Sequence, residues 1–309
     1  MQSIIAYILG GILLLLFLLP CLTGNLEKKE LNERTRVGIE GDFIKLSNGY
    51  THYELKGAKN NKLVVLVHGN AAPLFSWDNN VDALTNEGFS VLRYDVYGHG
   101  FSDRPKLRKY DREFYDKQLY ELVKILNITE PFYLVGTSQG GNIAAYFAAN
   151  HPELVSKIAF LAPYFDESVG QKGLAMFRSI IGDYMLSVIG DKMITNPQKV
   201  LHNDTKVDEL RTKLEKQMHF KGKKRAFIAN VRGNSFDNFG SHYQTLSKSK
   251  IPVLLTWGEN DISIPKESME RMKKLFCNIE YREIKHASHL AHYEYPHVIN
   301  PILIDFFKK

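Results

Sequence analysis

Five short runs along the chain are hydrophobic almost without interruption. They cover residues 63–69, 89–95, 132–138, 157–163 and 251–258. Continuous apolarity is typical of strands buried on both faces, because a strand with one solvated face alternates polar and apolar positions. The runs therefore predict a parallel sheet that is covered by helices on both sides.

Helix-like stretches at 111–126 and 141–150 alternate with these runs, which predicts an α/β fold with a doubly wound sheet. Residues 165–249 carry helical patterns but no convincing long strand, and they are too long for an ordinary crossover. We expect this stretch to be a helical insertion between the sixth and seventh core strands. Residues 25–40 are polar and are expected to form a linker.

The first part of the chain has a different character, since residues 3–22 contain no charge. A run of this length is sufficient for a helix that crosses a bilayer. It predicts an uncleaved membrane anchor over residues 1–24, with a cleaved signal peptide as the alternative. The lysines and arginines that follow weakly place the remaining chain in the cytoplasm.

Composition excludes some classes of function. The formal net charge is +6, but the basic residues are spread over the whole chain without interleaved stacking aromatics, so no nucleic-acid partner is expected. The two cysteines are too few for a disulfide framework or a cysteine-based zinc site.

The sequence GTSQG, residues 136–140, lies between an apolar run and an alanine-rich helical stretch. A serine at the tip of such a strand-to-helix bend is exposed as a nucleophile, and its neighbours must be small so that strand and helix can pass closely. The helix N-terminus adds partial positive charge, which favours an oxyanion there. Ser138 is therefore the predicted nucleophile.

A serine hydroxyl needs a base to take its proton and an acid to orient that base. His289 is the predicted base, because it follows a strand predicted at 279–284 and begins the spacing H-x-x-x-x-E-x-P. Asp261 is the predicted acid, since it lies just beyond the last of the five runs. The alternatives that remain open are His286 and His292 for the base, and Asp166 and Glu259 for the acid.

The tetrahedral intermediate of acyl transfer also needs hydrogen-bond donors for its oxyanion. Two backbone amides are expected to supply them, one from Gln139 directly after the nucleophile and one from Asn70 after the first run. His68 precedes that loop, and we predict that it bonds neighbouring backbone and takes no part in catalysis.

The chain resembles the α/β-hydrolase family from about residue 43 to its end, on five motifs in the family's order. They are HGN at 68–70, RYDVYGHGFSDRP at 93–105, GTSQG at 136–140, WGEND at 257–261 and HLAHYEYP at 289–296. The resemblance implies an α/β-hydrolase domain over 41–309 with a helical cap at about 165–249. It implies Ser138, Asp261 and His289 as the catalytic triad, with Asn70 and Gln139 as the oxyanion donors.

The nucleophile narrows the chemistry within that family. Similar epoxide hydrolases and haloalkane dehalogenases carry aspartate where this chain has Ser138, so neither activity is expected. A serine suits hydrolysis of ester, thioester, amide or carbon–carbon bonds, and none of these reactions needs a cofactor or a metal. One departure from the pattern is Ser288, which stands before His289 where similar proteins commonly have glycine.

The leading prediction is a membrane-anchored serine esterase or lipase that acts through an acyl-enzyme on a small-molecule or lipid ester, with a resemblance to monoacylglycerol lipase-like hydrolases. Hydrolysis of a carbon–carbon bond in a vinylogous diketone, with the same triad, is one alternative. Acyl transfer to an acceptor other than water is another. A non-catalytic binding module is the alternative from a different class.

Overall fold

The computed structural model describes residues 25–70, 72–165, 175–197, 200–233 and 240–309, together with residues 7, 10, 11, 14, 15, 18–20, 22 and 23. Within these residues, eight strands form one sheet in the order β1-β2-β4-β3-β5-β6-β7-β8. The strands are β1 (Asp42–Leu46), β2 (Gly49–Lys56), β3 (Lys62–Val67), β4 (Phe89–Tyr94), β5 (Phe132–Thr137), β6 (Val155–Leu161), β7 (Val253–Gly258) and β8 (Ile279–Ile284).

Strands β3 to β8 pair in parallel, whereas β1 and β2 are antiparallel and form one edge of the sheet. All five continuous apolar runs contain a parallel strand, and every residue of β4 and β7 is buried. The predicted sheet, mostly parallel and flanked by helices, is thereby confirmed. β1 and β2 had no such run, because they keep partly exposed residues at the edge of the sheet.

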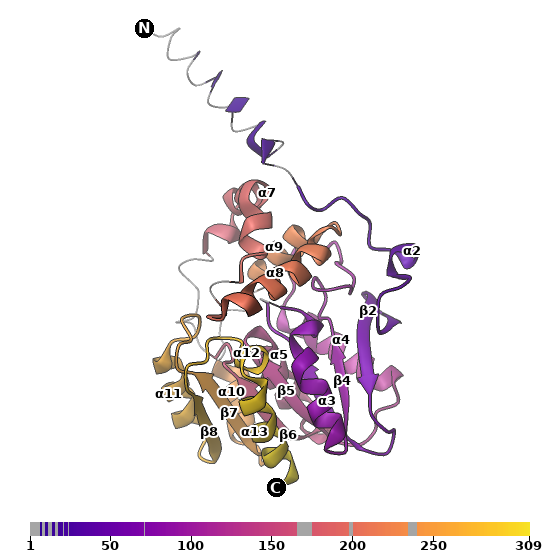
Figure 1. Cartoon of the computed structure of the whole chain (residues 1–309), viewed down its shortest axis with the longest axis vertical. Coiled ribbons are helices and arrows are strands. Elements are labelled where there is room, and N and C mark those ends of the chain that lie inside the picture. Colours follow the sequence, from indigo (N-terminus) through magenta and orange to yellow (C-terminus); the bar gives the residue numbers. More distant parts are fainter. Residues whose placement is uncertain are drawn as a thin grey trace.

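Helices cover both faces of the sheet (Figure 1). Apolar side chains of α3 and α13 pack against one face, and those of α4, α5, α10 and α11 pack against the other. The helices over the two faces and in the C-terminal part are α3 (Asp78–Asn86), α4 (Arg112–Ile125), α5 (Gln139–Asn150), α10 (Gly240–Ser247), α11 (Lys266–Leu275), α12 (Ala291–Glu294) and α13 (Pro296–Lys308), with short 3-10 turns η1 (Leu74–Trp77) and η2 (Pro152–Leu154).

Between β6 and β7, the described residues form helices and no strand. They are η3 (Ala175–Arg178), α7 (Ile180–Ile194), α8 (Asp204–Met218), α9 (Lys223–Arg232) and α10. Figure 1 shows α7, α8 and α9 together beyond one end of the sheet. By contrast, α10 contacts α5 and belongs to the layer that covers the sheet.

The segment that precedes the sheet, which was expected to be a linker, is attached to the helices at that end. The backbone N–H groups of Lys28 and Lys29 donate to the carbonyl of His219 at 2.9 and 2.7 Å. The carboxylate of Glu27 accepts from the backbone N–H groups of Gly222 and Lys224 at 2.9 and 2.6 Å, where α9 begins. A carboxylate on the otherwise unsatisfied N–H groups of a helix start stabilises that start.

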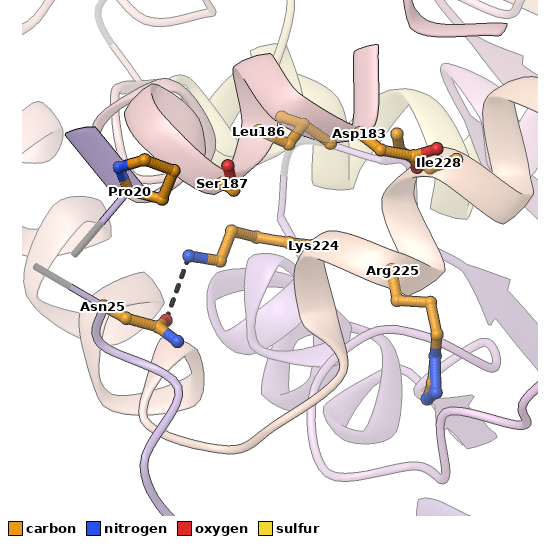
Figure 2. A pocket seen from close by; sticks show the side chains of 8 residues that line it. All are labelled: Pro20, Asn25, Asp183, Leu186, Ser187, Lys224, Arg225 and Ile228. Atoms are coloured by element: carbon orange, nitrogen blue, oxygen red, sulfur yellow. Dashed lines mark hydrogen bonds between the residues drawn. The ribbon is translucent and has the colours of Figure 1, made fainter. Parts of the chain in front are cut away.

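A pocket of about 310 Å³ lies between this segment, α7 and α9. Figure 2 shows the side chains that line it. The Nζ of Lys224 donates to Oδ1 of Asn25 at 2.9 Å across it and forms an ion pair with Asp191 at 3.1 Å. None of the residues that line it is among the predicted site residues. The pocket is therefore a feature of the attachment and not of the predicted active site.

The predicted membrane anchor requires a correction. Eleven of residues 3–22 lie outside the described residues. Crossing a bilayer takes about 20 consecutive helical residues. Among the described residues, no helix is both long and apolar enough for this. The structure therefore contradicts the predicted single-pass membrane localisation, and with it the weakly favoured cytoplasmic side and the membrane as a partner.

Candidate active site

Ser138 lies at the turn between β5 and α5 with φ 54° and ψ −122°, in a backbone region that non-glycine residues rarely adopt. The two glycines that flank this turn have no room for side chains. A methyl carbon on Gly136 would overlap the carbonyl of Gly140, and one on Gly140 would overlap the carbonyl of Val67. The spacing of the glycines in GTSQG is therefore required by the close passage of strand and helix.

Neighbouring backbone holds this turn in place. The N–H of Ser138 donates to the carbonyl of Leu161 at 3.1 Å, and the carbonyl of Ser138 accepts from the N–H groups of Gly141 and Tyr164 at 3.0 and 2.9 Å. A strained backbone persists only where its surroundings determine it in this way. The turn thus holds the serine at the end of the strand where the parallel sheet presents its active-site edge.

Asp261 and His289 are brought together from two different loops. Oδ2 of Asp261 lies 2.8 Å from Nδ1 of His289, and both side chains are buried. Oδ1 of Asp261 accepts from the backbone N–H groups of Ser263 and Ile264 at 2.7 and 3.0 Å, which fixes the carboxylate. Because an ionised carboxylate only accepts hydrogen bonds, Nδ1 carries the proton and Nε2 is left with the lone pair that a base needs.

The other candidates have different surroundings. The side chain of His286 is 80% exposed, and its Nδ1 is 3.8 Å from Oε2 of Glu259. His292 is fully buried, neither of its ring nitrogens has a hydrogen-bond partner among the described residues, and burial lowers its pKa to about 3. A histidine in that position is neutral and has no acid to orient it. Asp166 lies outside the described residues.

Gln139 is the first residue of α5. The N–H groups of a first helical turn have no intrahelical acceptor, so the N–H of Gln139 can donate to an oxyanion. The loop that carries Asn70 also lies beside the nucleophile, since a methyl carbon on Gly69 would lie 2.7 Å from Cβ of Ser138. Oδ1 of Asn70 accepts from Nε2 of His99 at 2.8 Å, which orients the Asn70 side chain.

His68 is wholly buried and bonded to backbone through both ring nitrogens. Nδ1 lies 2.7 Å from the carbonyl of Gly69, and Nε2 accepts from the N–H of Val96 at 2.9 Å. Burial lowers the pKa of His68 to about 4, so the ring is neutral at physiological pH. These contacts join the Asn70 loop to the segment that follows β4, and they leave no ring nitrogen for catalysis.

Tyr164 is a site residue that the sequence interpretation missed. Its backbone N–H donates to the carbonyl of Ser138 at 2.9 Å, and burial, with the charge of Asp261 added, raises the pKa of the phenol to about 12. The phenol is therefore protonated beside the nucleophile. A signal was present, because Tyr164 follows a buried strand at the same edge of the sheet as Ser138 and Asp261.

Glu294 explains the spacing that singled out His289. Its Oε1 accepts from the backbone N–H groups of His202 and Asn203, both at 2.9 Å, at the start of α8. Its Oε2 accepts from the N–H and Oγ of Ser288 at 3.1 and 2.8 Å. The serine that replaces the common glycine is thus part of a bonded connection between the His289 loop and α8.

No cluster that could hold a metal ion occurs among the described residues. The site combines a serine on a strained turn, a histidine bonded to a carboxylate, and N–H groups at the start of a helix. This combination is suited to nucleophilic attack on a carbonyl.

Residues 62–183 match the family profile described as alpha/beta hydrolase fold. The 2-hydroxy-6-oxononadienedioate/2-hydroxy-6-oxononatrienedioate hydrolase of Paraburkholderia phymatum is 28% identical over 267 residues, which cover 82% of this chain and 90% of that protein. Epoxide hydrolase 3 of Xenopus tropicalis is 28% identical over 282 residues, covering 84% of this chain and 74% of that protein. Monoacylglycerol lipase ABHD6 of Homo sapiens is 22% identical over 286 residues, covering 88% and 83%.

Solved structures agree on the fold. The crystal structure of the enol-lactonase from Burkholderia xenovorans LB400 matches with a TM-score of 0.72 at 21% identity, covering 87% of this chain and 100% of that chain. The fold expected from the five motifs is confirmed: the chain has the α/β-hydrolase fold, and the relatives that match most of its length are hydrolases. The relatives favour the carbon–carbon alternative over the predicted ester lipase.

Proposed function

We propose that this hydrolase cleaves a carbon–carbon bond next to a ketone in a vinylogous diketone, with Ser138 as nucleophile, His289 as base and Asp261 as orienting acid. The observation that carries the proposal is the 28% identity, over 267 residues, to a hydrolase named for a 2-hydroxy-6-oxo dienedioate. The aspartate-nucleophile chemistry expected of similar epoxide hydrolases is disfavoured because the elbow carries Ser138.

The reaction follows from the geometry of the site. Oγ of Ser138 adds to the ketone carbon as Nε2 of His289 takes its proton, and the N–H groups of Gln139 and Asn70 stabilise the oxyanion. The carbon–carbon bond then breaks, its electron pair passes into the conjugated half as a dienolate, and the proton from His289 is returned to that half. Water, deprotonated by His289, releases the acyl half as a carboxylic acid, so one water is consumed overall.

Helices α7, α8 and α9 are proposed to act as the cap over this site. Two bonded connections join them to catalytic loops, namely Glu294 at the start of α8 and Asn230 of α9 on Gln139. A cap that excludes water strengthens the electrostatic interactions of the site and protects the reactive dienolate from side reactions.

Ester hydrolysis with the same residues is the second candidate. Similarity to monoacylglycerol lipase ABHD6 over 88% of this chain favours it, although at the lower identity of 22%. Both reactions begin with attack of Ser138 on a carbonyl, and they differ in the leaving group, an alkoxide in one case and a stabilised carbanion in the other.

The deciding experiment measures two reactions on the purified full chain. One is the loss of the dienolate chromophore of a 2-hydroxy-6-oxo dienoate, and the other is hydrolysis of p-nitrophenyl esters of increasing acyl length. Ser138→Ala is expected to abolish the first, and exposed Ser241→Ala is the matched control. Turnover of esters with none of the diketone would replace the proposal by the second candidate. Activity that survives in Ser138→Ala would reject the serine mechanism for both.

A further inference from the structure

Helix α9 presents one buried face to the loops around the nucleophile. Lys223, Ala226 and Asn230 are spaced i, i+3 and i+7 and are 5%, 2% and 0% exposed. The Nζ of Lys223 donates to the carbonyl of Gly98 at 3.2 Å, and a methyl carbon on Gly98 would lie 2.8 Å from Cβ of Ala226. The first turns of α9 are therefore packed on the loop after β4.

The last turn of α9 is bonded to the nucleophile turn itself. Nε2 of Gln139 donates to Oδ1 of Asn230 at 2.6 Å, and Nδ2 of Asn230 donates to Oε1 of Gln139 at 2.9 Å. The two side chains thus exchange a reciprocal pair of hydrogen bonds, and they are 1% and 0% exposed. The contact joins residues that are 91 positions apart in the chain.

A reciprocal buried amide pair is sensitive to geometry. Both hydrogen bonds of the pair are lost if α9 moves away from the nucleophile turn. The pair therefore holds only when α9 is docked on the nucleophile turn. The combined length of the two side chains also matters, because the glutamine on α5 and the asparagine on α9 together span the distance between the two helices.

The residue held by this pair is the expected oxyanion donor. The N–H of Gln139 is attached to the Cα that carries the clamped side chain, and this N–H has no intrahelical acceptor to hold it. The preceding residue, Ser138, has the strained φ of 54°. The clamp on the Gln139 side chain is thus a direct restraint on the orientation of the first peptide of α5.

We propose that Asn230 is a positioning residue that aligns the N–H of Gln139 for the oxyanion, so that the oxyanion site is complete only when α9 is docked. The inference rests on the proposed serine mechanism and adds a residue from the helical insertion to it. It applies equally to carbon–carbon and ester substrates, because both reactions pass through an oxyanion on the attacked carbonyl.

The test exchanges the two amides. Gln139→Asn and Asn230→Gln each change the span of the pair by one methylene, and the double variant Gln139→Asn/Asn230→Gln restores the total length. Displacement of a catalytic group by about 1 Å can cost about 100-fold in rate. Each single variant is expected to lose about 10- to 100-fold in kcat with KM within about twofold, and the double variant is expected to recover to within about threefold of the original enzyme.

Two further measurements separate alignment from stability. The rate of Ser138 labelling by a fluorophosphonate, whose phosphonyl oxygen occupies the oxyanion site, is expected to follow kcat through the series. Asn300→Ala is the matched control, because Asn300 forms a buried amide contact with Asn80 at 2.6 Å on α13 and α3. This control is expected to lower the melting temperature while it leaves kcat within about twofold, the range expected of a site remote from the chemistry.

The inference would be overturned if the single variants had lower melting temperatures but kept kcat. It would also be overturned if the losses of kcat multiplied in the double variant, and the contact would then be purely structural. Asn230→Ala, with a loss of kcat at least as large as that of Asn230→Gln, supports it further. Failure of the underlying mechanism has a different signature, since the original enzyme would then resist fluorophosphonate labelling altogether.

Discussion

Nδ1 of His289 lies 2.8 Å from Oδ2 of Asp261, and the other carboxylate oxygen is held by the N–H groups of Ser263 and Ile264. Backbone N–H groups thus fix the carboxylate independently of its contact with the His289 ring. Three of its four bonding directions are used by groups of the protein, so it has little freedom to turn away from His289.

Asp261→Asn tests this orientation. An amide can donate to Nδ1, which would select the wrong tautomer of His289 and remove the lone pair from Nε2. In a serine protease the corresponding change lowers kcat about 10⁴-fold, and we expect a loss of about 10³- to 10⁴-fold here. Steady-state kinetics measure it, with Glu259→Gln as the control for a neighbouring exposed carboxylate that is expected to leave kcat unchanged.

The assignment of the base is tested on two histidines of the same loop. His289→Gln removes the proton acceptor and is expected to reduce kcat by more than about 10³-fold. His286→Gln is expected to change kcat by less than about twofold, because that side chain is exposed. Equal losses in the two variants would contradict the assignment.

Tyr164→Phe tests the phenol beside the nucleophile. The substitution removes one buried hydroxyl near Ser138, and a net contribution of about 1 kcal/mol corresponds to a loss of about fivefold in kcat/KM. Fluorophosphonate labelling of Ser138 provides a second measurement of the same loss. Tyr281→Phe is the control, because its hydroxyl contacts Glu283 on β8. A rate unchanged in Tyr164→Phe would show that the phenol does not orient the nucleophile.

His52 gives the protein a pH-dependent stability. Its two ring nitrogens face Oδ2 of Asp95 and the carbonyl of Glu40, both at 2.7 Å and both acceptors, so both nitrogens carry protons. Burial by itself would lower the pKa of His52, but the hydrogen bond and charge of Asp95, with smaller contributions from Glu40 and Glu54, outweigh it and raise the pKa. A raised pKa stabilises the folded state fully below about pH 6.5, the value of the unfolded chain, and this stabilisation is lost as the pH rises through the folded value.

The free energy of unfolding, measured by urea denaturation from pH 6 to pH 9, is therefore expected to fall as the pH rises. His52→Gln is expected to be less stable throughout and to show a flatter dependence, since the titrating group is gone. Exposed His297→Gln is the control and should retain the original slope. Parallel curves for His52→Gln and the original protein would assign the slope to another group.

Local sequence was sufficient for most of the sheet, because strands buried on both faces are apolar at nearly every position. The turn at Ser138 was also predictable from local sequence, because the close passage of strand and helix requires glycines at fixed positions around the serine. The edge strands β1 and β2 were not predicted, because their partly exposed residues do not form a continuous apolar run. The N-terminal run is the opposite case, because its apolarity predicted a membrane-spanning helix and none is found among the described residues.

Sequence patterns also supplied Ser138, Asp261 and His289 as a prediction, through the rule that functional side chains follow parallel strands at one edge of a sheet. They could not supply the partners of those residues. The contact of Gln139 with Asn230 spans 91 positions, and Glu294 reaches His202 across 92. Hydrogen bonds between such distant residues leave no local periodicity, because they depend on how the helices between β6 and β7 dock on the sheet, and only the tertiary structure determines that docking.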